Sequence, residues 1–139
     1  MKKYSIGIDP GKNTGFALYG IPEAKLLIVD SMDFWRVYNA VLRYKTNDLS
    51  RVVVEVPATK HVWHKDAANT KAMQRQAVNV GGVIREAELM ADGLEYLGYP
   101  VVRVHPRGKV DRERFIKYTG WTDRCNEHAR DAAMLCYGR

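Results

Sequence analysis

The sequence of 139 residues is poor in cysteine, with only Cys125 and Cys136, both near its C-terminal end. A small secreted domain stabilised by disulfides needs more cysteines than this, and no CxxC or mixed Cys/His spacing indicates a zinc site. We therefore expect two reduced thiols in a cytoplasmic protein.

Long apolar runs are missing as well. No stretch approaches the ~18 consecutive apolar residues of a membrane span, and Met1-Lys2-Lys3 is followed by too few apolar residues for a signal peptide. The sequence shows no repeat, low-complexity segment or linker, and its length suits one hydrophobic core rather than two. We expect a single domain over residues 1–139, without a membrane contact or a nucleotide cofactor.

Acidic residues are in the minority, with 16 Asp and Glu against 22 Lys and Arg. The resulting formal net charge of +6 and the sequence pI of about 9.4 favour a polyanionic partner such as nucleic acid.

The segment from Tyr4 to Tyr19 predicts a β-hairpin, because two β-prone runs flank the turn formers Pro10-Gly11. Asp9 ends the first of these strands. A carboxylate there is costly to bury unless it is paired or binds a cation, and divalent metals are the usual partners of clustered carboxylates. Turn chemistry alone is the other interpretation of Asp9, and both stay open on this segment.

The next segments predict a third strand over residues 24–30 and a helix that begins at Ser31 or Asp33 and ends near Lys45. Arg51–Pro57 is rich in β-branched residues and predicts a central parallel strand, buried on both faces. Glu55 stands out in this strand because a buried glutamate needs compensation. The alternative interpretation is that Glu55 lies on an edge strand and faces solvent.

Two features follow in the middle of the chain. A basic stretch around Trp63 fits a surface that grips phosphates and offers an indole to bases, although a core tryptophan with solvated neighbours fits equally well. Met73–Leu97 predicts a long helix whose Gly81-Gly82 pair marks either a close approach of DNA or a second subunit, or a break between two helices.

The last third of the chain predicts a strand over residues 101–105, parallel to the Glu55 strand, then a basic loop and a short helix that Gly120 ends. The final helix has Asn126 as its N-cap, and its small residues imply close packing on another element. We interpret Glu127 as a favourable charge at a helix N-terminus. That interpretation is weaker for Asp131, which lies further into the helix.

These motifs resemble a known family. Ile8-Asp9-Pro10-Gly11 with Gly15, the strand Val52-Val53-Val54-Glu55 and the terminal His128-Ala129-Arg130-Asp131-Ala132-Ala133 are similar in order and spacing to RuvC-type Holliday junction resolvases of the ribonuclease H-like superfamily, especially the short phage members. The resemblance implies an α/β fold with a mixed five-stranded sheet in the order 3-2-1-4-5, flanked by helices. It also implies that the protein acts in the cytoplasm of a bacterium or of a phage-infected host cell.

The resemblance also implies the site. Asp9, Glu55 and Asp131 match the family's metal ligands, and His128 stands where many members have another Asp. Two Mg²⁺ or Mn²⁺ ions, about 4 Å apart, would serve hydrolysis that leaves a 5′-phosphate and a 3′-hydroxyl. A homodimer would supply the two cuts that a four-way DNA junction requires. The expected DNA-contacting residues are Lys60, Trp63, Lys65, Arg107, Lys109 and Arg112.

Three alternatives compete with a junction resolvase. A ribonuclease H-like nuclease for other branched DNA or RNA–DNA hybrids would use the same acidic residues. An actin-like ATPase or sugar kinase needs two such domains, for which the chain is too short. A module that binds junctions without cutting them has no need of three carboxylates, which weaken binding to a polyanion.

Overall fold

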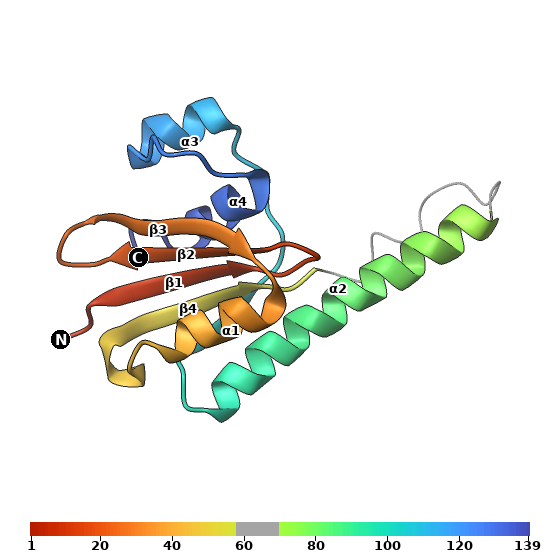
Figure 1. Ribbon diagram of the computed structural model, residues 1–139, viewed down its shortest axis with the longest axis horizontal. Coiled ribbons are helices and arrows are strands. Elements are labelled where there is room, and N and C mark those ends of the chain that lie inside the picture. Colours follow the sequence, from red (N-terminus) through yellow and green to blue (C-terminus); the bar gives the residue numbers. More distant parts are fainter. Residues whose placement is uncertain (58–69) are drawn as a thin grey trace.

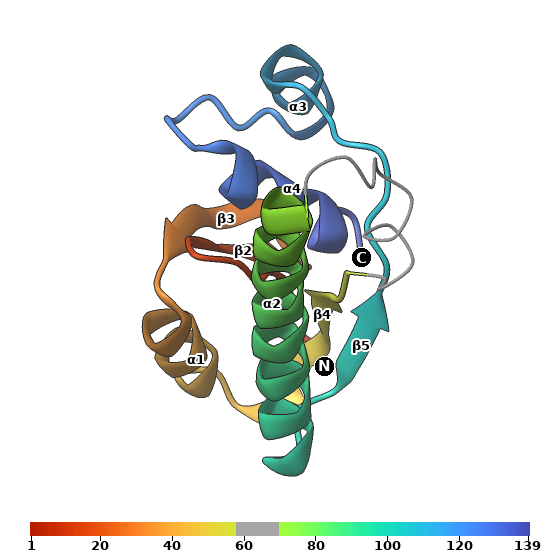
Figure 2. The ribbon, with the colours of Figure 1, turned by 90° about the vertical axis from the view of Figure 1, so that its right-hand side faces the viewer.

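The computed structural model describes residues 1–57 and 70–139, without the side chains of residues 70–73, 76, 77, 79 and 80. It is an α/β structure in which helices cover both faces of one sheet (Figures 1 and 2). Its elements are β1 (Tyr4–Asp9), β2 (Thr14–Gly20), β3 (Lys25–Met32), α1 (Phe34–Leu42), a short 3₁₀ helix (Thr46–Asp48), β4 (Leu49–Glu55), α2 (Thr70–Tyr96), β5 (Val101–Val104), α3 (Arg112–Thr119) and α4 (Glu127–Cys136).

The five strands lie in the order β3-β2-β1-β4-β5, which confirms the expected sheet. The first three strands form an antiparallel meander, whereas β4 runs parallel to both β1 and β5. This arrangement makes β1 and β4 inner neighbours whose carboxyl ends meet at the same edge of the sheet.

Burial on both faces explains the apolar character of the inner strands. Val52, Val53 and Val54 alternate in direction, yet all three are buried, as expected for a strand covered from both sides. One part of the core lies between the sheet and the helices α1 and α2, and the other lies beneath α3 and α4. The sheet is thus the middle of three layers.

The helix ends follow the capping residues in the sequence. The N–H of Arg36 donates to Asp33 Oδ1 over 2.9 Å, so Asp33, and not Ser31, is the N-cap of α1. This helix ends at Leu42, before the predicted Lys45, and the Tyr99 hydroxyl then donates to the carbonyl of Tyr44. Gly120 ends α3 in the left-handed conformation with φ of 72°.

Helix α2 is continuous through Gly81-Gly82, so the predicted alternative of a break there is wrong. Neither glycine has a positive φ, and a methyl group on either would meet no atom of the described part of the chain within 4 Å. The N-terminal half of α2 runs out past the sheet, as Figure 1 shows. A helical backbone therefore passes this pair without strain, at the usual propensity cost of about 1 kcal/mol per glycine.

Across the described residues, no helix is both long enough and apolar enough to span a membrane.

Candidate functional site

Asp9 and Glu55 lie side by side because they end neighbouring parallel strands. Ile8 of β1 pairs with Val54 of β4, which sets the next residue of each strand at the same edge of the sheet. Asp9 is 8% exposed and Glu55 is half-buried. Since β4 lies between β1 and β5, the alternative that placed Glu55 on an edge strand is wrong.

Helix α4 brings His128 and Asp131 to the same edge, and two glycines of the sheet permit its close approach. A Cβ on Gly15 would lie 2.0 Å from the carbonyl oxygen of His128, and one on Gly7 would lie 2.0 Å from that of Ala132. Any larger residue at either position would collide with the helix backbone. The sheet and α4 therefore touch through backbone atoms, which fixes the height of His128 above Asp9.

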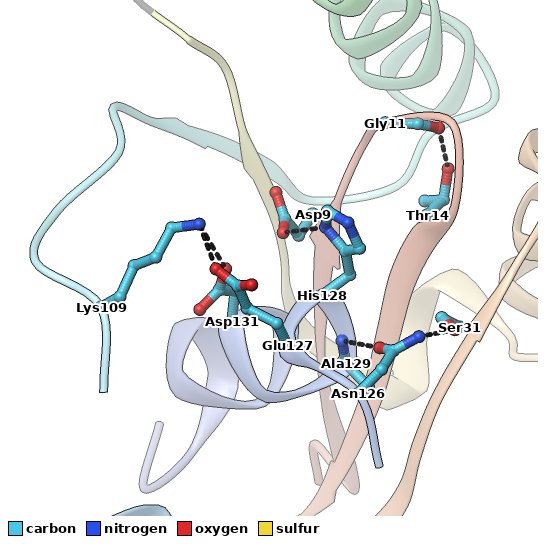
Figure 3. A network of polar contacts seen from close by, with 10 residues as sticks. All are labelled: Asp9, Gly11, Thr14, Ser31, Lys109, Asn126, Glu127, His128, Ala129 and Asp131. Carbon is cyan, nitrogen blue, oxygen red and sulfur yellow. Dashed lines mark hydrogen bonds and ion pairs between the residues drawn. The ribbon is translucent and has the colours of Figure 1, made fainter. Parts of the chain in front are cut away.

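The first turn of α4 is also tied to the sheet by its cap. The N–H of Ala129 donates to Asn126 Oδ1 over 2.9 Å, which confirms Asn126 as the N-cap. The same side chain donates through Nδ2 to Ser31 Oγ of β3 over 2.6 Å (Figure 3). One residue thus starts the helix and holds it against β3.

His128 contacts Asp9 directly. Its Nδ1 lies 3.4 Å from Asp9 Oδ2, and the imidazole is 44% exposed (Figure 3). When Nδ1 carries the proton it donates to Asp9, and Nε2 keeps a lone pair for a ligand or a water molecule. Asp9 thereby orients His128, as carboxylates commonly orient metal-binding histidines.

Lys109 reaches the site from the loop between β5 and α3. Its Nζ donates to Glu127 Oε1 in a short contact and lies 3.9 Å from Asp131 Oδ2 (Figure 3). Sequence reasoning missed this role of Glu127, which it had explained by helix electrostatics alone. No local pattern reveals it, because the contact joins residues 18 apart through the fold.

Asp9, His128, Lys109 and Asp131 line one cleft of about 570 Å³. Asp9 and Glu55 come from the sheet, His128 and Asp131 from α4, and the segment His105–Val110 forms part of the wall. The residues of the sequence-predicted site that the cleft brings together are Asp9, Glu55, His128, Asp131, Arg107 and Lys109. Arg112, at the start of α3, is exposed and does not line it. Lys60, Trp63 and Lys65 lie outside the described residues.

The cleft holds its carboxyls at an energetic cost. Burial raises the pKa of Glu55 to about 8, and a hydrogen bond with Asp9 and the negative charge of Asp9 act in the same direction. Burial likewise raises the pKa of Asp9 and that of Asp131, whereas the Lys109 ammonium lowers both. The hydrogen bond between Asp9 and Glu55 lowers the pKa of Asp9 and raises that of Glu55, so Glu55 is the member of the pair that keeps its proton to higher pH and donates it to Asp9.

The donor set suits a hard divalent cation. Carboxylate oxygens are what Mg²⁺ and Mn²⁺ prefer, an imidazole nitrogen is an accepted addition, and a cation would relieve the repulsion that raises the pKa of each carboxyl. As placed, no three His, Cys, Asp or Glu side chains among the described residues converge closely enough to share one ion. The acids line a common cleft, and Lys109 supplies a positive charge to Asp131.

No family model matches the chain, and no curated protein does either. The assignment of a function therefore depends on the geometry and chemistry of this cleft.

Proposed function

We propose that this protein is a cation-dependent endonuclease of the ribonuclease H-like, RuvC-type class, which resolves four-way DNA junctions by paired symmetric nicks. The observation that carries the proposal is that Asp9, Glu55, His128 and Asp131 line one cleft, which Arg107 and Lys109 also line. Acidic groups weaken binding to a polyanion, so a cleft of carboxylates in a chain of net charge +6 suits catalysis better than binding alone.

Asp9, Glu55 and Asp131 are the residues that would hold Mg²⁺ or Mn²⁺, with His128 as a further ligand or a positioner of water. Such ions activate water, orient the scissile phosphate and stabilise the leaving oxygen. The remaining roles belong to the chain itself. Asp9 holds the His128 ring by its contact at 3.4 Å, and Lys109 offers an ammonium to a backbone phosphate.

The fold supports this proposal in two ways. Parallel pairing of β1 with β4 brings two carboxylates together at a rigid strand edge, where catalytic groups keep their geometry. The flanking basic residues attract DNA phosphates, which the carboxylates of the cleft repel. A junction has two symmetric scissile sites, so we also propose that the active form is a two-fold dimer.

The test is incubation of purified protein with a labelled four-way junction, a linear duplex and an RNA–DNA hybrid, in Mg²⁺, Mn²⁺ or EDTA. We expect symmetric nicks in the junction alone, with 5′-phosphate ends, abolished by EDTA and by Asp9→Asn. Asp123→Asn is the matched control, because Asp123 is exposed and lies outside the cleft. Cleavage chiefly of the hybrid would reassign the substrate, and binding without cleavage in any metal would contradict the enzymatic proposal.

A further inference from the structure

The margin of the cleft already carries a cation, the Lys109 ammonium. It contacts Glu127 and lies 3.9 Å from Asp131 Oδ2, one of the proposed metal ligands. Its positive charge also lowers the pKa of Asp9 and of Glu55. Lys109 therefore offsets part of the negative charge that a divalent ion would offset.

Glu127 determines where this ammonium lies. It sits one helical turn before Asp131 on α4, so one lysine can reach both carboxylates. The contact with Glu127 is the largest cause of the raised pKa of Lys109, ahead of the charge of Asp131. Glu127 itself is 53% exposed and projects from the first turn of α4, as Figure 3 shows, so it holds Lys109 at the margin of the cleft rather than inside it.

We propose that Lys109 is a displaceable counter-ion of the cation site, and that Glu127 is the positioning residue that keeps it beside Asp131. This inference rests on the proposed function and adds a regulatory feature to its site. A divalent ion bound by Asp131 repels the ammonium, so the ion and Lys109 compete for the same carboxylate. Displaced Lys109 keeps its contact with Glu127 and is available to a phosphate that enters the cleft.

Competition between Lys109 and a divalent ion predicts a change in cation affinity, which can be measured without nucleic acid or cleavage. Titration of the protein with Mn²⁺ alone, followed by calorimetry, should show that Lys109→Gln binds the ion about fivefold more tightly than the wild type, as expected for loss of a solvent-screened ion pair. Lys109→Arg keeps the positive charge and should stay close to the wild-type affinity. Both changes are at a side chain that is 66% exposed, so the fold should survive them.

A double-mutant cycle isolates the part played by Glu127. If Glu127 holds Lys109 in place, Lys109→Gln should change Mn²⁺ affinity less than about twofold in a Glu127→Gln background. An equal effect in both backgrounds would remove Glu127 from the proposal. A second readout is the side-chain NMR signal of Lys109, assigned by its absence in Lys109→Arg, which should shift when Mg²⁺ saturates the protein.

The outcomes separate this inference from the proposed function. Equal Mn²⁺ affinities of wild type and Lys109→Gln, with an unchanged Lys109 signal, would overturn the counter-ion while leaving the nuclease proposal intact. Absence of Mn²⁺ binding in both proteins would contradict the cation-dependent function itself, and the counter-ion with it.

Discussion

Glu55 is the residue whose environment has the clearest thermodynamic consequence. Its pKa is raised to about 8 from the ordinary glutamate value of 4.5, mainly by burial. Between these two values the native protein binds a proton that the unfolded chain has released. The stabilisation of the native state by this bound proton is therefore complete below about pH 4.5, declines as the pH rises, and is lost above about pH 8.

We predict that Glu55→Gln removes this pH dependence. The glutamine amide can still donate to Asp9, so the variant keeps the contact and loses the titration. In EDTA at about pH 8, the free energy of unfolding of the variant should exceed that of the wild type by about 2 kcal/mol. This is less than the free energy that corresponds to the whole pKa shift, because Glu55 is only half-buried and solvent screens its charge. Urea denaturation at about pH 5 and about pH 8 measures the difference. The exposed Glu23→Gln is the control, and parallel curves for wild type and Glu55→Gln would contradict the shift.

His128 gives a second prediction at this scale. Its Nε2 is free for a ligand or water when Nδ1 donates to Asp9, and loss of such a group typically lowers catalysis by about 10²-fold or more. We expect that decrease in single-turnover junction cleavage by His128→Ala. His128→Asp, which supplies an oxygen ligand, should retain more activity than the alanine variant. Equal rates for wild type and His128→Ala would assign the histidine to structure alone.

Residues of the candidate site were predictable from the sequence where a single residue is unusual in its local surroundings. Asp9, Glu55 and Asp131 are carboxylates at a strand end, in an apolar strand and in a helix of small residues, and each is conspicuous in the sequence. The pairing of Glu127 with Lys109 was not predictable, because it depends on the path of a loop across α4.

At the scale of the elements, the close contact of α4 with the sheet decides whether a site forms. Gly15 faces the His128 carbonyl at a distance that a methyl group cannot occupy. We predict that Gly15→Ala lowers the free energy of unfolding by about 3 kcal/mol through overpacking, and that it reduces junction cleavage by moving His128 away from Asp9. Urea denaturation and the cleavage assay measure the two effects.

Gly82→Ala is the matched control for the urea denaturation. A methyl group there meets no atom of the described residues within 4 Å, and the residue is helical, so the substitution should raise stability by about 1 kcal/mol. A Gly15→Ala protein as stable and active as the wild type would show that α4 can shift outward without consequence.

The elements themselves were largely predictable from local patterns. All five strands were expected because β-branched runs and turn formers mark them, and the caps Asn126 and Gly120 were placed correctly. The continuity of α2 was not predictable, because a glycine pair in the sequence is compatible both with a break in the helix and with the close approach of another backbone. The end of α1 was also missed, since Tyr99, far along the chain, binds the carbonyl of Tyr44 there.

At the scale of the molecule, the order of the strands is what makes the site, and local sequence does not determine it. The neighbouring positions of β1 and β4 follow from a long-range pairing that only the family resemblance supplied. Hydrophobic periodicity identifies a buried strand but not its neighbour in the sheet. This is why the separate carboxylates were more predictable than the cleft that unites them.

The outer face of α2 bears on the proposed dimer. Ala87, Met90 and Leu94 turn towards the core, whereas Val78 and Tyr96, at 73% and 88% exposed, point away from it. Gly81 and Gly82 lie on the same side as Val78, and a methyl group on either would meet no atom of the described residues within 4 Å. If the proposed dimer uses this side of α2, a two-fold axis at the glycine pair would set Val78 of each copy against the helix of the other.

We predict that Val78→Glu weakens the proposed dimer. If this face is the contact, the substitution should raise the dimer dissociation constant about tenfold, because it would place a carboxylate of each copy between the two helices without a partner. Sedimentation equilibrium measures the constant, with Lys117→Glu on α3 as a control in the opposite layer. An unchanged constant in Val78→Glu would exclude this face. A wild-type protein that stays monomeric at all concentrations would require another source for the second nick.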